Sequence, residues 1–426
     1  MQKKYDVAII GAGPAGNASA LYLLQAGLKP IIIEKEDFPR YHVGESFTGE
    51  CAARLRGLGL HEQMVAAGYP VKNGVKVYGT DGKNDFWVPV RKRDENHQLQ
   101  DTQTWQVRRS TFDDLLLKTA LERGADYYQA SVLAPIQEAG KVVGVQTRNK
   151  VGEQQSIQAS VTIDATGQNT FFASHTDLLS TKERGNYDKQ VAIFSQVKGA
   201  IRGLETKGPG DTIIFYKEKH HWAWFIPIDD EHVSVGVVTP SEYFKSQPYS
   251  KDEFLKRELR TLNPQLSQRL PSIELEEPAR AASNYSYHIE KFTGPGFLCV
   301  GDAHRFLDPI FSFGVQIALS EAEFAAQAIK KHLMNETTNS VKDDTVNPFI
   351  DYQNYVEGGQ KIVQNLIDCF WEYPHAFLYF IKNRYTDGII DIFSGRIYGK
   401  NKPEETIAAL QNLLATANTT PMKGNA

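Results

Sequence analysis

A glycine-rich turn between a predicted strand and a predicted helix is the segment of this chain best suited to bind a nucleotide. The apolar run 5–10 precedes Gly11, Gly13 and Gly16, and Glu34 follows 18 residues after Gly16, at the end of a second apolar run. In such a turn the first glycine permits a tight bend, the second lets backbone N–H groups approach a pyrophosphate, and the third lets the helix pack on the strand. The acid accepts hydrogen bonds from ribose hydroxyls, and the helix N-terminus favours phosphate. The spacing therefore predicts a dinucleotide site.

Two later segments favour FAD as the dinucleotide. One is a strand running into the turn 164–167, and the other is a strand that ends in Gly301 and Asp302 before a new helix. Large flavoproteins resemble the chain in these places, and in them the Gly-Asp pair contacts the ribityl–phosphate region. No second G-x-G-x-x-G follows another strand, so we expect no separate NADPH domain.

The composition limits the classes of protein to which this chain can belong. The chain has 426 residues, a net charge of -4 and 23% charged residues, which give no argument for nucleic acid or an anionic membrane as a partner. Its three cysteines are far apart and odd in number, which favours a reducing cytoplasm and predicts neither disulfides nor a metal site. No apolar run reaches about 18 residues, so we expect no transmembrane segment.

The order of predicted elements indicates an α/β fold combined with an antiparallel sheet. Helical spacing over 112–124 and a hairpin over 142–161 return the chain to the first sheet. Alternating strands within 72–105 and 186–285 predict an antiparallel sheet covered by a helix over 251–262. Aromatic residues crowd together in 370–380, and we interpret them as packing residues rather than substrate contacts. We expect a discontinuous Rossmann-type FAD-binding domain (1–71, 105–185 and 286–340), an inserted β-rich substrate domain (72–104 and 186–285) and a C-terminal helical region (341–426).

Four segments together resemble flavin-dependent halogenases, within the single-FAD-domain monooxygenase-like flavoproteins. They are the nucleotide turn, the loop 38–46, the W-x-W-x-I-P pattern over 222–227, and the segment 301–315. Tryptophan-type halogenases carry a glutamate where this chain has Phe311. The apolar residue favours the branch that acts on phenols, pyrroles or carrier-tethered substrates.

The resemblance implies a reaction that consumes reduced FAD, O2 and chloride or bromide. A separate flavin reductase would supply the reduced FAD, and hypohalous acid would halogenate an electron-rich aromatic substrate, either a small molecule or a group tethered to a carrier protein. The segment 68–74 is similar to the G-F-x-x-K-x-G segment of the family, which places Lys72 in the active site. Lys72 would hydrogen-bond hypohalous acid or carry the halogen as a haloamine; the alternative is a solvated surface lysine.

The resemblance also assigns roles to other side chains. The barrier between flavin and substrate would comprise Trp222, Trp224, Ile226 and Pro227, although both tryptophans also suit one face of a sheet core. The turn Ser312, Phe313 and Gly314 would hold halide through backbone N–H groups, or serve only the flavin. Arg108 is an alternative to Arg109 as a cofactor contact. The predicted cofactor-binding residues are Gly11, Gly13, Ala15, Gly16, Glu34, Arg40, Ser46, Arg109, Gly301, Asp302, Gly314 and Val315.

Two other functions remain open at this point. The same fold could carry out hydroxylation or a prenyl-reductase-like reaction. A non-catalytic FAD-binding scaffold is the second alternative. Halogen in the product distinguishes the first alternative from a halogenase, and substrate-dependent oxygen consumption distinguishes the second.

Overall fold

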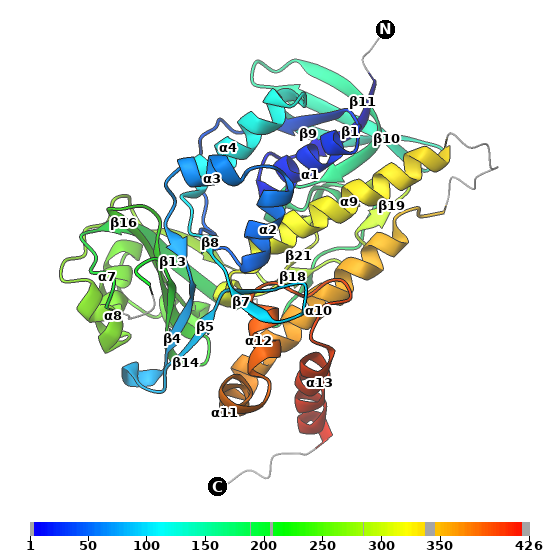
Figure 1. Cartoon of the computed structure of the whole chain (residues 1–426). Helices are drawn as coiled ribbons and strands as arrows, with labels where there is room; N and C mark the ends of the chain where they lie inside the picture. The colour runs from blue at the N-terminus through cyan, green and yellow to red at the C-terminus, as the bar shows by residue number, and fades with distance from the viewer. Residues whose placement is uncertain (1–3, 188, 205–207, 284, 337–345, 420–426) are drawn as a thin grey trace.

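The protein was analysed as a computed structural model, which describes residues 4–187, 189–204, 208–283, 285–336 and 346–419 (Figure 1). One seven-stranded sheet carries the nucleotide turn. In it β1 (Lys4–Ile10) runs parallel to β2 (Pro30–Glu34) on one side and to β11 (Gln154–Asp164) on the other. The remaining strands are β9 (Asp126–Glu138), β10 (Lys141–Asn149), β19 (Thr293–Gly294) and β20 (Phe297–Cys299).

Helices cover this first sheet because its central strands are apolar on both faces. Residues 7–9 of β1 and 31–33 of β2 are buried, as expected for parallel strands with helices packed against them. The covering helices include α1 (Pro14–Gln25), α4 (Arg109–Glu122) and α9 (Gly314–Glu336). Helix α4 begins three residues before the predicted start at 112.

A second seven-stranded sheet lies to one side of the first (Figure 1). Its order is β17-β13-β16-β15-β14-β4-β5, and neighbours pair antiparallel except β14 with β4. The prediction of an antiparallel sheet is therefore wrong at this one pair, because β4 enters from a segment distant in sequence rather than through a hairpin. The bounds are β4 (Gly74–Tyr78), β5 (Phe86–Pro89), β13 (Gln190–Lys198), β14 (Thr212–Glu218), β15 (His221–Pro227), β16 (His232–Pro240) and β17 (Arg280–Ser283).

The two faces of the second sheet pack against different parts of the molecule. Val235, Val237 and Phe225 share a core with helix α7 (Lys251–Thr261), as the predicted helix over 251–262 requires. Trp222 and Trp224, on the opposite face, share a core with the C-terminal helices. Strand alternation thus places both tryptophans on the face toward the rest of the molecule. Helices α6 (Ser241–Lys245) and α8 (Pro264–Arg269) lie in the same region.

The chain ends in helices that pack through aromatic side chains. Phe370, Trp371 and Phe377 are buried, whereas Tyr379 is 53% exposed. Phe311, in the turn before α9, contacts the rings of Phe370 and Phe377. The helices are α10 (Ile350–Glu372), α11 (Pro374–Tyr379), α12 (Thr386–Phe393) and α13 (Glu404–Thr419).

The predicted fold class, an α/β unit with a Rossmann-type sheet, a second β-rich unit and a helical C-terminal region, is confirmed. The domain boundaries remain predictions, and the one at 340 lies outside the described residues. Shorter elements connect the larger ones: α2 (Gly49–Gly57), α3 (His61–Ala66), β3 (Val71–Lys72), β6 (Arg91–Arg93), β7 (Leu99–Asp101), β8 (Thr104–Trp105), α5 (Phe171–His175), β12 (Glu183–Arg184), β18 (Tyr287–His288) and β21 (Arg305–Phe306).

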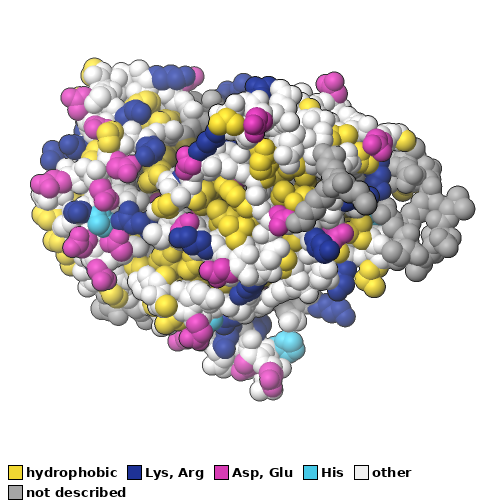
Figure 2. Space-filling view, turned by 90° about the horizontal axis from the view of Figure 1, so that it is seen from above, with side chains coloured by type: hydrophobic (Ala, Val, Ile, Leu, Met, Phe, Trp, Pro, Cys, Tyr) yellow, Lys and Arg dark blue, Asp and Glu magenta, His cyan; other side chains and the backbone are white. Residues whose placement is uncertain are grey.

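The surface carries no strong charge of one sign in the view of Figure 2, where basic and acidic side chains alternate around a central group of apolar ones. Among the described helices, none combines the length and the hydropathy needed to span a bilayer.

Candidate active site

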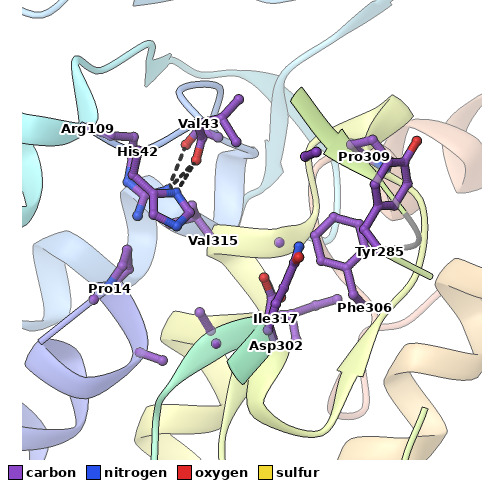
Figure 3. A pocket seen from close by; sticks show the side chains of 18 of the residues that line it. Pro14, His42, Val43, Arg109, Tyr285, Asp302, Phe306, Pro309, Val315 and Ile317 are labelled. Carbon is purple, nitrogen blue, oxygen red and sulfur yellow. Dashed lines mark hydrogen bonds between the residues drawn. The ribbon is translucent and has the colours of Figure 1, made fainter. Parts of the chain in front are cut away.

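A cavity of about 590 Å³ lies where the first sheet, the second sheet and α9 meet. Its lining includes Glu34 at the end of β2, Trp224 of β15 and Val315 of α9, so segments far apart in sequence form one space. The volume is in the range of cofactor and ligand sites. Figure 3 shows the side chains around it.

The nucleotide turn has the geometry that its glycines predict. Gly11 has φ +103, and a Cβ there would lie 2.6 Å from the Ala165 carbonyl oxygen, while a Cβ on Gly16 would lie 1.9 Å from the Gly11 oxygen. A Cβ on Gly13 would meet only the Arg40 Nη2, at 3.8 Å. Gly11 and Gly16 are therefore required by the fold, and Gly13 leaves open space at the N-terminus of α1, in the cavity.

Glu34 holds the turn as well as lining the cavity. Its carboxylate accepts hydrogen bonds from the backbone N–H of Ala12 and that of Glu36, both at 2.8 Å. Each carboxylate oxygen keeps a further lone pair. The carboxylate therefore keeps the acceptor capacity that the predicted contact with ribose hydroxyls needs.

Arg109 is the arginine of the pair that lines the cavity. Its guanidinium donates to both carboxylate oxygens of Asp113, at 2.8 and 2.9 Å. It also donates to the carbonyl oxygen of Val43 at 2.8 Å (Figure 3). Arg108 instead donates to Asp229 at 2.6 Å and is absent from the cavity wall. Arg109 thus shapes the loop that contains His42 and Val43, and Arg40 lies in the same wall.

The Gly-Asp turn and the start of α9 form another part of the wall. Asp302 lines the cavity, and burial raises its pKa to about 7 despite the nearby Arg109 charge. Gly301 does not line the cavity; its N–H donates to Glu321 at 2.6 Å. At Gly314 an added Cβ would meet nothing within 4 Å, so the N-terminus of α9 is open to the space.

The predicted halide turn lies in this wall. Ser312 adopts a left-handed conformation with φ 60, and Phe313 is buried. Ser312, Phe313 and Gly314 all line the cavity, as does Val315. An open helix N-terminus offers positive potential to an anion.

The residues present fit FAD by two independent features. The space beside Gly13 gives a pyrophosphate access to the N-terminus of α1, and the space beside Gly314 leaves the N-terminus of α9 open to the anionic reduced flavin. Ala15 also lines the cavity, whereas Gly16 serves the packing of the turn.

Three of the four residues predicted to form the barrier lie in the cavity wall. Trp222, Trp224 and Ile226 line the cavity from alternate positions of β15, and the two indole centroids are 5.9 Å apart. The Trp224 indole N–H donates to Ser234 Oγ at 3.1 Å, which fixes the ring. Pro227 ends the strand and does not line the cavity.

Lys72 is buried and lies behind the wall of the cavity rather than in it. Its side chain is 2% exposed, and Nζ donates to Ser46 Oγ at 2.8 Å and to the Phe47 carbonyl oxygen at 2.9 Å. Ser46 lines the cavity and Lys72 does not. Burial lowers the pKa of Lys72 to about 8, because a charged amine is costly away from water. The solvated alternative for Lys72 is wrong.

Three polar residues in the wall received no role from the sequence. Thr212 hydrogen-bonds Ser46 at 2.6 Å. Burial raises the pKa of Glu45, and raises that of Asp308 to about 7. The sequence signal for the two acids is a charged residue next to glycine or proline in a mostly apolar segment. Thr212 lies at the start of an alternating strand, and no sequence signal marks it as a wall residue.

The class of protein follows from the turn and the cavity beside it: a flavoprotein of the family described as FAD binding domain, whose pattern matches residues 4–344. The chain is 39% identical to a 1H-pyrrole-2-carbonyl-[peptidyl-carrier protein] brominase of Pseudoalteromonas luteoviolacea, over 89% of each chain. It is 29% identical to a 1H-pyrrole-2-carbonyl-[peptidyl-carrier protein] chlorinase of Pseudomonas fluorescens, over 98% of this chain and 94% of the relative. The solved structure of flavin-dependent brominase Bmp2 matches with TM-score 0.87 and 36% identity, covering 98% of this chain and 100% of that one.

The chain therefore belongs to the flavin-dependent halogenases, in the non-tryptophan branch. It is an FAD-dependent oxidoreductase, and its reaction uses halide. This family membership confirms the predicted activity over a hydroxylase, a prenyl-reductase-like enzyme or a scaffold without turnover.

Proposed function

We propose that this halogenase acts on a pyrrole-2-carbonyl group tethered to a carrier protein, and that Lys72 activates the halogenating species. The two relatives described above are named for that substrate. Phe311, which replaces the glutamate of the tryptophan-type enzymes, packs among Phe370, Phe377 and Phe393. An apolar residue at this position suits a substrate without the cationic amine of an amino acid.

Bound reduced FAD, supplied by a separate flavin reductase, would convert O2 and halide into hypohalous acid. Gly13 and the N-terminus of α1 would hold the pyrophosphate. Backbone N–H groups of 312–314 would hold halide. Trp222 and Trp224 would keep the organic substrate away from the isoalloxazine, so that halide rather than carbon meets the oxidant.

Lys72, which is buried behind Ser46 in the wall of this space, carries the proposal. A lysine in contact with bulk water would be fully protonated and solvated at neutral pH. A buried lysine with a pKa of about 8 gives up its proton more readily. Asp211 and Cys51 are the titratable groups whose charges act on it. Such an amine can donate a strong hydrogen bond to hypohalous acid, or accept halogen when neutral.

The first test compares Lys72→Met with Lys76→Met. Lys76 is a neighbouring lysine that pairs with the exposed Asp85 and lies outside the cavity wall. We expect Lys72→Met to bind FAD and release peroxide normally but to lose halogenated product by about 10²-fold or more, and Lys76→Met to match wild type. Product formed by Lys72→Met at the normal rate would remove the lysine from the mechanism.

Substrate is tested separately, with bromide and chloride and a panel of free pyrrole, phenol and indole beside a pyrrole-2-carbonyl carrier protein. Halogen isotope patterns identify the product. We expect the carrier-bound group to be preferred over the free ring. Faster halogenation of a free ring would contradict the substrate assignment and leave the role of Lys72 intact.

We also propose the cytoplasm as the compartment. Cys51, Cys299 and Cys369 are all unpaired and buried, as in proteins of reducing compartments.

A further inference from the structure

We propose that Thr212 is the residue that touches the halogenating species, and that Lys72 acts on it through a directed chain of hydroxyl groups, Lys72 to Ser46 to Thr212. The inference rests on the proposed role of Lys72 and specifies how a buried amine reaches a cavity that it does not line. Thr212 would be a catalytic residue, and Ser46 and Gln106 would be positioning residues.

The chemistry of the partners fixes the direction of two of the three hydrogen bonds, those at the two ends of the chain. Gln106 Nε2 donates to the Gly210 carbonyl oxygen at 3.0 Å and to Thr212 Oγ1 at 2.9 Å. A carbonyl only accepts, so the amide nitrogen must face Gly210, and the same nitrogen then donates to Thr212. At the other end the Lys72 ammonium only donates, so Ser46 Oγ accepts from it.

Ser46 Oγ keeps a second lone pair, so its 2.6 Å hydrogen bond with Thr212 Oγ1 is compatible with either hydroxyl as the donor. The relay takes Ser46 as the donor, because only this direction carries a proton from Lys72 to Thr212. Thr212 then accepts two hydrogen bonds, from Ser46 and Gln106, and its own hydroxyl proton has no acceptor among the described residues. Because Thr212 lines the cavity, that proton is available to a ligand there.

The chain ends beside the predicted barrier. Thr212 begins β14, and Ile214 two residues later is paired in register with Trp224 of β15. Both Thr212 and Ile214 line the cavity, as alternation along a strand requires. The Thr212 hydroxyl is thus on the sheet face that carries Trp224.

This geometry favours the hydrogen-bonding role of Lys72 over the haloamine role. Halogen transfer to nitrogen needs direct contact between hypohalous acid and Nζ, and Ser46 stands between them. In the proposed step a ring carbon uses an electron pair to form the carbon–halogen bond, and the halogen–oxygen bond breaks. The departing hydroxide takes the Thr212 proton and leaves as water.

The remaining protons then balance. Thr212 is reprotonated by Ser46 and Ser46 by the Lys72 ammonium. The proton lost from the ring carbon returns to Lys72 through the hydroxyls of Thr212 and Ser46. The net change is hypohalous acid plus a ring C–H giving a ring carbon–halogen bond plus water; the ring is oxidised and the halogen is reduced.

The test uses Thr212→Val, Thr212→Ser and Ser46→Ala, with Thr239→Val as the matched control. Thr239 is a buried threonine of β16 outside the cavity wall, so its hydroxyl has no part in the chain. With bromide, reduced FAD and a pyrrole-2-carbonyl carrier protein, Thr212→Val and Ser46→Ala should lower kcat for product by about 10²-fold. Peroxide release should continue. Thr212→Ser, which keeps a hydroxyl group, should retain far more product than Thr212→Val, and Thr239→Val should stay close to wild type.

The outcomes separate the relay from the role of Lys72. Loss of product in Lys72→Met with normal turnover in Thr212→Val would overturn the relay alone. Normal product in Lys72→Met would overturn the proposed function. Equal losses in Thr212→Val and Thr212→Ser would show that shape rather than the hydroxyl matters, and would also overturn the relay.

A second readout needs no turnover. Acetic anhydride labelling of the full chain, followed by peptide mass spectrometry, compares Lys72 with Lys118, whose side chain is 68% exposed. We expect Lys72 to react far more slowly than Lys118 in wild type, and markedly faster in Ser46→Gly, where the wall is opened. Fast labelling of Lys72 in wild type, or no change in Ser46→Gly, would contradict its place behind Ser46.

Discussion

At the scale of single residues, burial changes what a lysine can do. Lys72 has hydrogen-bond partners at Ser46 and Phe47, yet its pKa is lowered to about 8 because desolvation outweighs the nearby Asp211 and Cys51. A folded state that holds a lysine below its usual pKa of 10.5 is less stable while that lysine is charged. This loss of stability arises from the burial of Lys72 and from the groups that contact it.

The free energy of unfolding should therefore depend on pH. Between the two pKa values the unfolded chain binds more protons at position 72 than the folded chain does, so folding becomes more favourable as the pH rises. Relative to Lys72→Met, wild type should gain about 2 kcal/mol between about pH 7.5 and 9.5. Urea unfolding of both FAD-saturated proteins at the two pH values measures it; a constant difference would mean an unperturbed lysine.

At the scale of elements, the turn between β1 and α1 divides its glycines by task. Gly16 has no room for a side chain because of the Gly11 carbonyl oxygen, whereas Gly13 faces open space near Arg40. Gly16 is therefore needed for folding, and Gly13 is needed for access of the ligand.

Substitutions should separate these tasks. Gly13→Val should fold with nearly wild-type Tm when both proteins are measured without flavin, but lose FAD affinity, because its side chain would occupy the approach of the pyrophosphate. Gly16→Val should lower Tm strongly, since a Cβ at that position would lie 1.9 Å from backbone oxygen. Flavin titration and thermal unfolding check both; tight FAD binding by Gly13→Val would place the phosphates elsewhere.

At the scale of the whole molecule, one aromatic residue connects the cavity wall to the C-terminal helices. Phe311 precedes the cavity-lining Ser312 and packs against Phe370, Phe377 and Phe393, from α10, α11 and α12. The C-terminal helices thereby support the predicted halide turn, and α10 also contributes Gln360 and Val363 to the cavity wall.

Phe311→Ala should cost about 3–5 kcal/mol of folding free energy, as removal of a buried phenylalanine does. Tyr379→Ala, at a half-exposed position of the same region, should stay within about 0.5 kcal/mol. Denaturant unfolding gives both values. A small effect at Phe311 would mean that the C-terminal helices and the turn are energetically independent.

Local sequence motifs were sufficient to predict the part of the protein that binds the flavin. Glycine spacing dictates a turn because Gly11 needs a positive φ and Gly16 a close approach, and both requirements are local. Strand alternation in β15 likewise predicts that Trp222 and Trp224 share a face. The parallel pairing of β4 with β14 was missed, because no local signal reports which distant strand becomes a neighbour.

Sequence by itself determined the nucleotide turn, the family resemblance and the lysine, because each depends on motifs whose own residues lie close together along the chain. Only the tertiary structure decided that Arg109 rather than Arg108 lines the cavity, that Pro227 does not, and that Lys72 is buried behind Ser46. Thr212 reaches Ser46 across 166 positions of sequence. Contacts of that separation arise from the packing of two sheets, which no spacing rule encodes.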